Sequence, residues 1–174
     1  MITIRPMIPT DWPALWTIIE PVFRAGETYV FSPDISETEA HKVWVDTPQI
    51  TYIAEDDLGT LLGTYYIKPN QPGLGSHVCN CGYIVAEAAR GQGIATLMGQ
   101  HSQQEATRLG FRAMQYNCVV ATNTVAVKLW QKLGLDIIGT LPEAFNHPTL
   151  GYVDAFVMYK PLRSSRQPMG ENKV

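Results

Sequence analysis

Apolar and polar positions follow two different periods in the centre of the chain. Residues 78–85 form an apolar run rich in β-branched and aromatic side chains, which is typical of a buried strand. From Ile94 onward the apolar residues recur every three or four positions, and the pattern ends at Gly110, which predicts a helix with a C-terminal glycine stop. Gly91 and Gly93 lie between the two patterns. The segment therefore predicts a strand, a tight glycine turn and a helix.

The flanking patterns predict a mixed α/β fold. Strands are expected over residues 2–5, 52–55, 61–68, 112–120, 137–141 and 152–159, and helices from Thr10 to a kink or end near Pro21, from Ser36 to Val45, and after Asn123. Residues 142–151 are expected to form a loop. Because a helix joins the strands 78–85 and 112–120, these two strands should pair in parallel at the centre of the sheet.

Length and composition predict one domain over residues 1–162. The chain has 174 residues, of which 45% are hydrophobic, and this is enough to bury a core. Residues 163–174 are polar and aperiodic, so they are predicted to form a disordered tail. A net charge of -3 argues against a nucleic-acid surface. The absence of a signal-like N-terminus and of an apolar run of about 20 residues predicts a cytoplasmic protein without a membrane partner.

The cysteines do not form a metal-binding pattern. Cys79 and Cys81 are expected on one strand face and Cys118 in the next strand, without further ligands at a suitable spacing. They are predicted to be buried free thiols, and no metal is expected.

The glycine turn is suited to binding an anion. Gly91 and Gly93 allow the backbone to approach a ligand closely, and the first N–H groups of the helix lack partners, so a phosphate there is favoured by about 0.3 to 2 kcal/mol. A Walker A loop is excluded, because the helix opens without Gly-Lys-Ser/Thr. A Rossmann fingerprint also fails, because Thr96 replaces its third glycine and no acidic ribose ligand follows. Several Lys and Arg residues follow instead, which suits a ligand with several phosphates.

Two motifs resemble those of the GNAT superfamily of N-acetyltransferases. Arg90-x-x-Gly93-x-Ala95 resembles the Q/R-x-x-G-x-G/A loop, and Asn123-x-x-Ala126-x-x-Leu129-Trp130-x-Lys132-x-Gly134-Leu135 resembles a later family motif at the family's spacing. The resemblance implies a mostly antiparallel sheet with a splayed central parallel pair and flanking helices. It also implies acetyl-CoA as co-substrate, bound by Val85, Arg90, Gly91, Gln92, Gly93, Ile94, Ala95, Asn123, Trp130 and Lys132.

The implied reaction is direct attack of an amine on the acetyl thioester. By resemblance, the backbone N–H of Val85 stabilises the oxyanion. A lysine-like amine lies about three pH units above neutrality in pKa, so delivering it unprotonated costs about 4 kcal/mol without a base. The sequence leaves the base open. The candidates are Glu27, His77, Glu87, His147 and Asp154.

The family's usual proton-donating tyrosine is replaced by Trp130 in this chain. Indole donates a hydrogen bond but is not a usable acid. Tyr116 or solvent is therefore expected to protonate the leaving thiolate, and Trp130 is expected to pack against the pantetheine arm or the core.

Two asparagines in apolar strands suggest an acceptor site. Asn80 and Asn117 need satisfied hydrogen bonds if buried, and both could face the acceptor's polar head across the central strands. Their surroundings resemble L-azetidine-2-carboxylate acetyltransferases, while the region from Glu27 and Tyr29 looks more like phosphinothricin acetyltransferases. Glu27, Tyr29, His77, Asn80 and Asn117 are thus the predicted acceptor residues, with Glu27, Asn80, Asn117 and Val85 in the reaction itself.

The resulting hypothesis is an N-acetyltransferase acting on a small amine or amino acid, expected to be a homodimer. A protein N-terminal or lysine acetyltransferase is the first alternative. It would need an open groove, which the loops 68–76 and 142–151 could close. A non-catalytic acyl-CoA sensor is the second alternative, and a dinucleotide-dependent oxidoreductase is the remotest.

Overall fold

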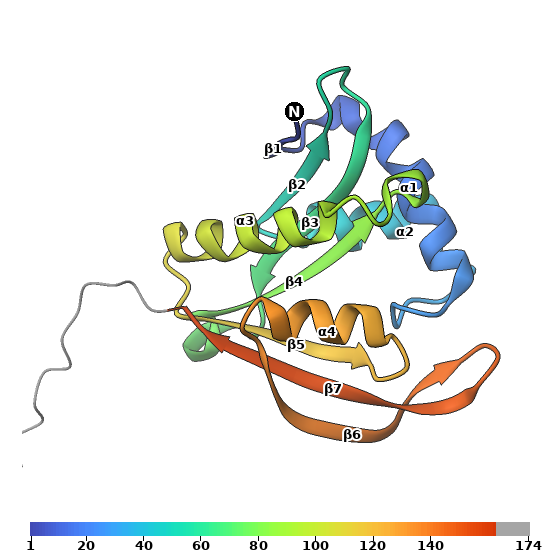
Figure 1. Cartoon of the computed structure of the whole chain (residues 1–174), viewed down its shortest axis with the longest axis vertical. Helices are drawn as coiled ribbons and strands as arrows, with labels where there is room; N and C mark the ends of the chain where they lie inside the picture. Colours follow the sequence, from blue (N-terminus) through green and yellow to red (C-terminus); the bar gives the residue numbers. More distant parts are fainter. Residues whose placement is uncertain (163–174) are drawn as a thin grey trace, which may run out of the picture.

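In the computed structural model, residues 1–162 are described, and their strands form one seven-stranded sheet in the order β1-β2-β3-β4-β5-β7-β6 (Figure 1). The strands are β1 (Thr3–Pro6), β2 (Ile50–Glu55), β3 (Leu61–Pro69), β4 (Val78–Val85), β5 (Ala113–Val120), β6 (Asp136–His147) and β7 (Gly151–Pro161). The α-helices are α1 (Trp12–Ala25), α2 (Glu37–His41), α3 (Ile94–Arg108) and α4 (Thr124–Lys132). A π-helical turn, Lys42–Asp46, continues α2, and 3-10 turns cover Pro9–Asp11, Gly73–Gly75 and Glu87–Ala89.

The sheet separates two hydrophobic cores. Strand alternation sends Tyr65 to the core beneath α3 and α4, and sends its neighbour Tyr66 to the core beneath α1 and α2 (Figure 1). Met98 and Trp130 fill the first core, and Trp44 is fully buried in the second. Both faces of the central strands are therefore covered, which explains why their sequences are apolar at nearly every position.

The centre of the sheet splits where β4 meets β5. This is the sheet's one parallel pair, and its backbone register contains only Val78↔Ala113 and Cys79↔Met114, although each strand has eight residues. Figure 1 shows the two strands diverging from this point towards their carboxyl ends. We call the opening between them the fork. The predicted mixed sheet with a splayed parallel pair is confirmed.

The structure departs from the sequence predictions at two element ends. Of the kink or end predicted near Pro21, the end is not observed: helix α1 continues to Ala25, because Leu15, Ile19 and Phe23 keep one buried stripe while Pro21 itself is exposed. Burial of a phenylalanine contributes roughly 1.5–3 kcal/mol, comparable to the cost of about 3 kcal/mol for an internal proline.

The predicted loop over residues 142–151 is also mostly strand. β6 runs to His147, with Phe145 opposite Val153, and only residues 148–150 connect it to β7. An irregularity between Leu141 and Phe145 includes Glu143, whose φ is 52°, and this bulge accommodates the proline at 142. The segment is thus part of the β6–β7 hairpin and not a loop. The predicted tail, residues 163–174, lies outside the described residues.

Candidate active site

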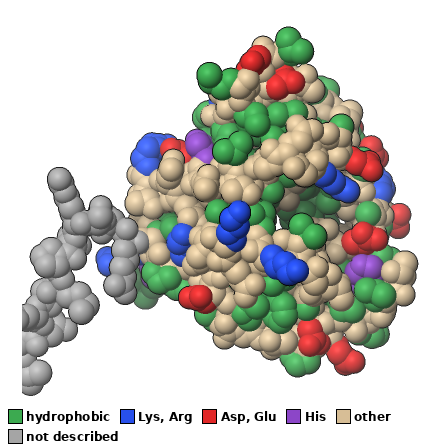
Figure 2. All heavy atoms as spheres, in the orientation of Figure 1, with side chains coloured by type: hydrophobic (Ala, Val, Ile, Leu, Met, Phe, Trp, Pro, Cys, Tyr) green, Lys and Arg blue, Asp and Glu red, His purple; other side chains and the backbone are tan. Residues whose placement is uncertain are grey.

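A cavity of about 690 Å³ occupies the fork. Its walls come from β3, β4, β5, the start of α3, one side of α4 and the loop at residues 28–31. Figure 2 shows this face of the molecule hollowed, with basic side chains near the opening and hydrophobic ones within it. A cavity of this size lined mainly by apolar groups is the usual form of a small-ligand site.

The glycine turn forms one end of the cavity. Gly91 and Gly93 have φ of 77° and 80°, the left-handed region that favours glycine, and nothing lies within 4 Å of where a Cβ would stand on either residue. Gly93 is the N-cap of α3, and no side chain caps the helix. The first N–H groups of a 15-residue helix therefore face open space beside Arg90, as an anion requires.

The predicted residues around this turn divide into two groups. Arg90, Gly91, Gly93, Ile94 and Ala95 line the cavity. Gln92 does not, because its side chain turns away and its Nε2 donates to the Ala88 carbonyl at 3.0 Å.

Helix α4 supplies the opposite wall. The Asn123 Oδ1 accepts from the Ala126 N–H at 3.2 Å, which is the predicted N-cap, and both residues line the cavity with Leu129 and Trp130. Lys132 is exposed at the end of α4 and lies outside the cavity wall.

The backbone of Val85 is oriented towards the fork. The next residue, Ala86, donates its N–H to the Leu62 carbonyl on β3 at 2.9 Å. Successive residues of a strand send their N–H groups to opposite edges, so the Val85 N–H points away from β3 and into the opening beside β5. Val85 also lines the cavity.

Tyr29 forms hydrogen bonds with backbone groups on the edge of β4 that faces the fork. Its hydroxyl donates to the Tyr83 carbonyl and accepts from the Tyr83 N–H, both at 2.8 Å. These are backbone groups that a fully paired β5 would otherwise satisfy. Burial raises the pKa of Tyr29 well above its usual value, so it stays a neutral phenol. Sequence reasoning placed Tyr29 on the acceptor wall but missed this role, which no local pattern signals.

The two asparagines lie in different environments although both line the cavity. Asn80 is buried, and its Nδ2 donates to the Gln115 carbonyl at 2.9 Å, linking the strands just beyond their last backbone pair. Asn117 is exposed, and its Nδ2 donates to the Asn70 Oδ1 at 2.7 Å. Asn80 therefore bonds to the backbone across the fork, whereas the hydrogen bonds of the Asn117 side chain are with the side chains of Asn70 and Gln115.

A layer of hydroxyl groups lies beneath Trp130. The Tyr83 Oη lies 2.8 Å from the Tyr116 Oη and 2.7 Å from the Ser102 Oγ. Ser102 uses its one proton to donate to the Gly99 carbonyl, so Tyr83 donates to Ser102. The Tyr116 hydroxyl also donates to the Met114 Sδ at 3.2 Å. Burial raises the pKa of both tyrosines well above the usual value.

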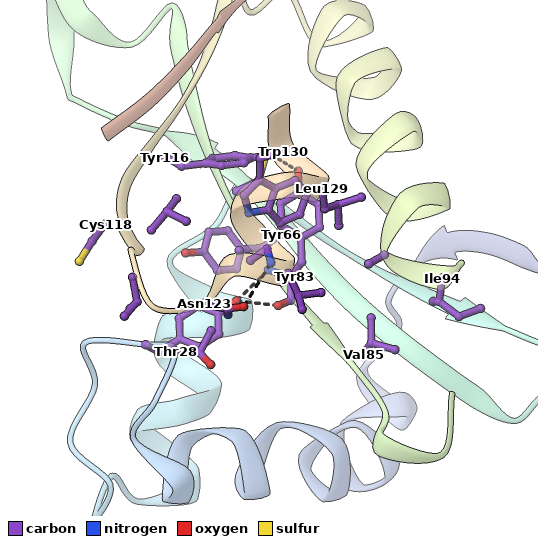
Figure 3. A pocket seen from close by; sticks show the side chains of 18 of the residues that line it. Thr28, Tyr66, Tyr83, Val85, Ile94, Tyr116, Cys118, Asn123, Leu129 and Trp130 are labelled. Atoms are coloured by element: carbon purple, nitrogen blue, oxygen red, sulfur yellow. Dashed lines mark hydrogen bonds between the residues drawn. The ribbon is translucent and has the colours of Figure 1, made fainter. Parts of the chain in front are cut away.

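The aromatic rings of this layer pack tightly. The Trp130 ring lies 4.7 Å from the Tyr83 ring and 5.0 Å from the Tyr116 ring, measured between centroids (Figure 3). Val85 and Ile94 lie further along the cavity towards α3. Sequence reasoning found Trp130 and Tyr116 but missed Tyr83, whose position in an apolar strand marked it only as core.

No Asp, Glu or His belongs to the described residues that line the cavity. Glu27, His77, Glu87 and Asp154 are exposed outside it. His147 lines an adjoining cavity of about 580 Å³ between residues 26–33 and the β6–β7 hairpin, which shares residues 29–31 with the main cavity. The charged side chains on the main cavity are Arg90 and Lys68. The structure thus does not bring Glu27 and His77 to the fork, and the catalytic base stays unassigned.

The cysteines are free. Cys79 and Cys81 are buried as predicted, whereas Cys118 is only half-buried and lines the cavity. Within residues 1–162, no group of three or more His, Cys, Asp or Glu residues could hold a metal ion. No helix in the described part of the chain is long and apolar enough to cross a membrane.

Comparison with known proteins agrees with this geometry. The model of the acetyltransferase (GNAT) family matches residues 12–135, which is most of the chain. The chain belongs to this family of acetyltransferases.

Two related sequences match part of the chain. N-acetyltransferase aca1 of Schizosaccharomyces pombe is 36% identical over 113 residues, covering 63% of this chain and 53% of that protein. A mycothiol acetyltransferase of Mycolicibacterium gilvum is also 36% identical, over 62% of this chain and 35% of that protein. The matched region thus spans about half or less of these relatives.

Solved structures match nearly the whole chain. A GCN5-related N-acetyltransferase from Kribbella flavida is 46% identical with a TM-score of 0.87, covering 92% of this chain and 97% of the other. A phosphinothricin acetyltransferase from Sinorhizobium meliloti in complex with AcCoA shares the fold, with 20% identity, a TM-score of 0.81 and coverage of 98% and 94%. The suspected GNAT membership and the structural likeness to the phosphinothricin type are confirmed.

Proposed function

We propose that this chain transfers the acetyl group of acetyl-CoA to the amine of a small molecule, an amino acid or an analogue of one. The observation that carries the proposal is the fork itself. One cavity with mainly apolar walls holds an uncapped helix N-terminus at one end and the polar side chains of Asn80 and Asn117 at the other. The complex of the Sinorhizobium meliloti enzyme with AcCoA supports the same co-substrate for this chain.

The first role of the fork is to bind and orient the donor. The α3 N-terminus and Arg90 hold the pyrophosphate, because both present positive charge there. The Leu129 and Trp130 side chains give the pantetheine arm an apolar wall. The Val85 N–H then donates to the acetyl oxygen and stabilises the negative charge that develops on attack.

Proton transfer follows from the groups that the cavity contains. Since the described lining holds no carboxylate or imidazole, solvent at the open side takes the proton of the attacking amine. Tyr116 donates to the leaving thiolate, because it is a neutral phenol that lines the cavity beside Trp130, whose indole cannot serve. The predicted roles of Glu27 and His77, the homodimer and the cytoplasmic location remain predictions, as do the absences of metal, nucleic-acid and membrane partners.

An acceptor screen tests the proposal. The purified chain is incubated with acetyl-CoA and a panel of amino acids, amino-acid analogues, small amines and peptides, and thiol release is followed. Release that depends on a small amine is expected. Release only with peptides would assign a protein acetyltransferase. Tight acetyl-CoA binding by calorimetry with no release from any amine would assign a sensor.

A further inference from the structure

Lys68 places a positive charge in the wall of the acceptor half of the cavity. It lies near the end of β3, where it pairs in register with Asn80 on β4. Val85 is five residues further along β4, so Lys68 lies roughly 17 Å along the strand from the donor end. Arg90 serves the donor end, and Lys68 is the other cation of the cavity wall.

The side chain of Lys68 is held by an aromatic ring and has no acidic partner. Its Nζ lies 5.4 Å from the centroid of the Tyr66 ring, and the residue is half-buried. Within residues 1–162, no carboxylate oxygen lies within 4.0 Å of it. A half-buried ammonium without a counter-charge is more costly than an exposed one, and an anionic ligand would remove that cost.

The neighbouring polar groups are all neutral. Asn80 is within 3.5 Å of the Tyr66 hydroxyl, and Asn117 with Asn70 completes the polar surface at this end. Amides and a phenol can form hydrogen bonds with either an amine or a carboxylate, so they give no preference for a positive or a negative ligand. Lys68 therefore determines that this end of the cavity prefers a negatively charged group.

We propose that Lys68 binds a carboxylate on the acceptor, so that the preferred substrates are amino acids and not simple amines. This rests on the proposed function and narrows its substrate class. The Lys68 ammonium, which lies over the ring of Tyr66 two residues nearer the level of Val85, would pair with the acceptor carboxylate. Asn117 would then orient the amine towards the thioester. A cationic acceptor would be repelled at the same position, and no acidic side chain of the described lining would offset that repulsion.

The test compares matched acceptors in matched variants. The acceptors are L-azetidine-2-carboxylate and L-methionine, each beside its own carboxamide, which keeps the amine but removes the negative charge. Amine basicity also differs between acid and amide, so the measured quantity is the acid-to-amide ratio of kcat/KM within each variant. The variants are Lys68→Met, Lys68→Arg and Lys42→Met, the last at an exposed lysine outside the cavity.

Lys68→Met is expected to raise KM for the acids by about 10- to 100-fold and to leave KM for the amides and kcat nearly unchanged. Lys68→Arg should retain the preference for acids, and Lys42→Met should behave as wild type. Failure of the wild type to turn over either acid overturns the proposal, and so does an acid-to-amide ratio that Lys68→Met leaves unchanged.

Calorimetry with acetyl-CoA distinguishes failure of the Lys68 proposal from failure of the proposed function. A wild type that binds acetyl-CoA and acetylates amines with no preference for acids would leave the proposed function intact and refute the role of Lys68. A wild type that does not bind acetyl-CoA would refute both. Lys68→Met must keep the wild-type affinity for acetyl-CoA, because a loss there would show that Lys68 acts on the donor and would contradict an acceptor role.

Discussion

The two ends of the fork are built from different parts of the chain. The donor end consists mainly of backbone groups from one continuous segment, the end of β4, the glycine turn and the start of α3. The acceptor end consists of side chains from four separate segments, represented by Tyr29, Lys68, Asn80 and Asn117. The donor end can therefore be recognised from a short motif, whereas the acceptor end depends on how distant strands are aligned.

Because the two ends use different groups, donor binding and acceptor specificity can change independently. Backbone N–H groups at a helix start bind any ligand with the same phosphates, so the donor end need not change when the acceptor does. Side chains set at the acceptor end can be exchanged one at a time without disturbing the turn. Specificity is thus expected to change through residues such as Lys68, and donor binding through the geometry at Gly93.

The largest expected effect is at the donor end. Gly93→Asp should abolish acetyl-CoA binding, because it adds a Cβ and a negative charge where the pyrophosphate must lie. The matched control is Gly110→Asp, since Gly110 has φ of 89°, lies just beyond the other end of α3 and also has open space around it. Both variants carry similar backbone strain. Calorimetry should show loss of binding in Gly93→Asp alone, and unchanged affinity in a folded Gly93→Asp protein would contradict the assignment.

Much of the fold was predictable because its signals are local. The capping box at Ser36, the N-cap at Asn123 and the extent of β4 all follow from short patterns, and the structure confirms each. The errors arose where tertiary contacts outweigh a local signal. Pro21 stays helical because Phe23 is buried, and β6 extends to His147 because β7 pairs with residues 145–147.

The site was only half predictable for the same reason. The cradle at Arg90 and Gly93 follows from glycine spacing alone. The link from Asn80 to the Gln115 carbonyl, the Tyr29 contact with Tyr83 and the Tyr83 hydroxyl layer join residues 33 to 54 positions apart, or bury a polar group in an apolar strand. A single sequence carries no periodic signal for such pairs.

The next largest effects are expected at the acceptor end. Asn117→Ala and Asn80→Ala should each lower kcat/KM for the acceptor by about 10²-fold, or about 2.7 kcal/mol, because both position the amine. Acetyl-CoA affinity should stay nearly unchanged. Asn80→Ala should also destabilise the fold by about 1 to 3 kcal/mol, because it leaves the Gln115 carbonyl without its donor.

The melting temperature and acceptor kinetics of the same two variants decide between positioning and structure. Asn117 is exposed, so its loss should barely change the melting temperature. If either variant loses stability but keeps normal specific activity, that asparagine has only a structural role.

A smaller effect is expected at Trp130, in the α4 wall of the cavity. Trp130→Phe should keep most of the turnover, because the ring packs against Tyr83 and Tyr116 and does not supply a proton. Tyr116→Phe, in contrast, should lower kcat, since it removes the proposed acid while leaving a ring of nearly the same shape. A loss of several orders of magnitude in kcat for Trp130→Phe, with acetyl-CoA affinity intact, would show that the indole N–H takes part in the reaction.

The smallest effect concerns stability at alkaline pH, and it tests whether the tyrosine layer is as buried as the structure indicates. Burial raises the pKa of Tyr83 and Tyr116 in the folded state, while an unfolded tyrosine loses its proton near pH 10. Above about pH 10 the unfolded chain therefore binds fewer protons than the folded one, so the free energy of unfolding falls as pH rises. The slope is up to about 1.4 kcal/mol per pH unit for each such tyrosine.

Tyr83→Phe should reduce the slope of the free energy of unfolding against pH by the contribution of one tyrosine. The variant also breaks the hydrogen bonds to Ser102 and Tyr116, which lowers stability at every pH, so the slope between pH 10 and 11 is compared and not the absolute value. Urea unfolding at several pH values measures it. An identical slope in wild type and Tyr83→Phe would mean that water reaches the Tyr83 hydroxyl, and the Tyr83–Tyr116 layer would then be open to solvent at the fork.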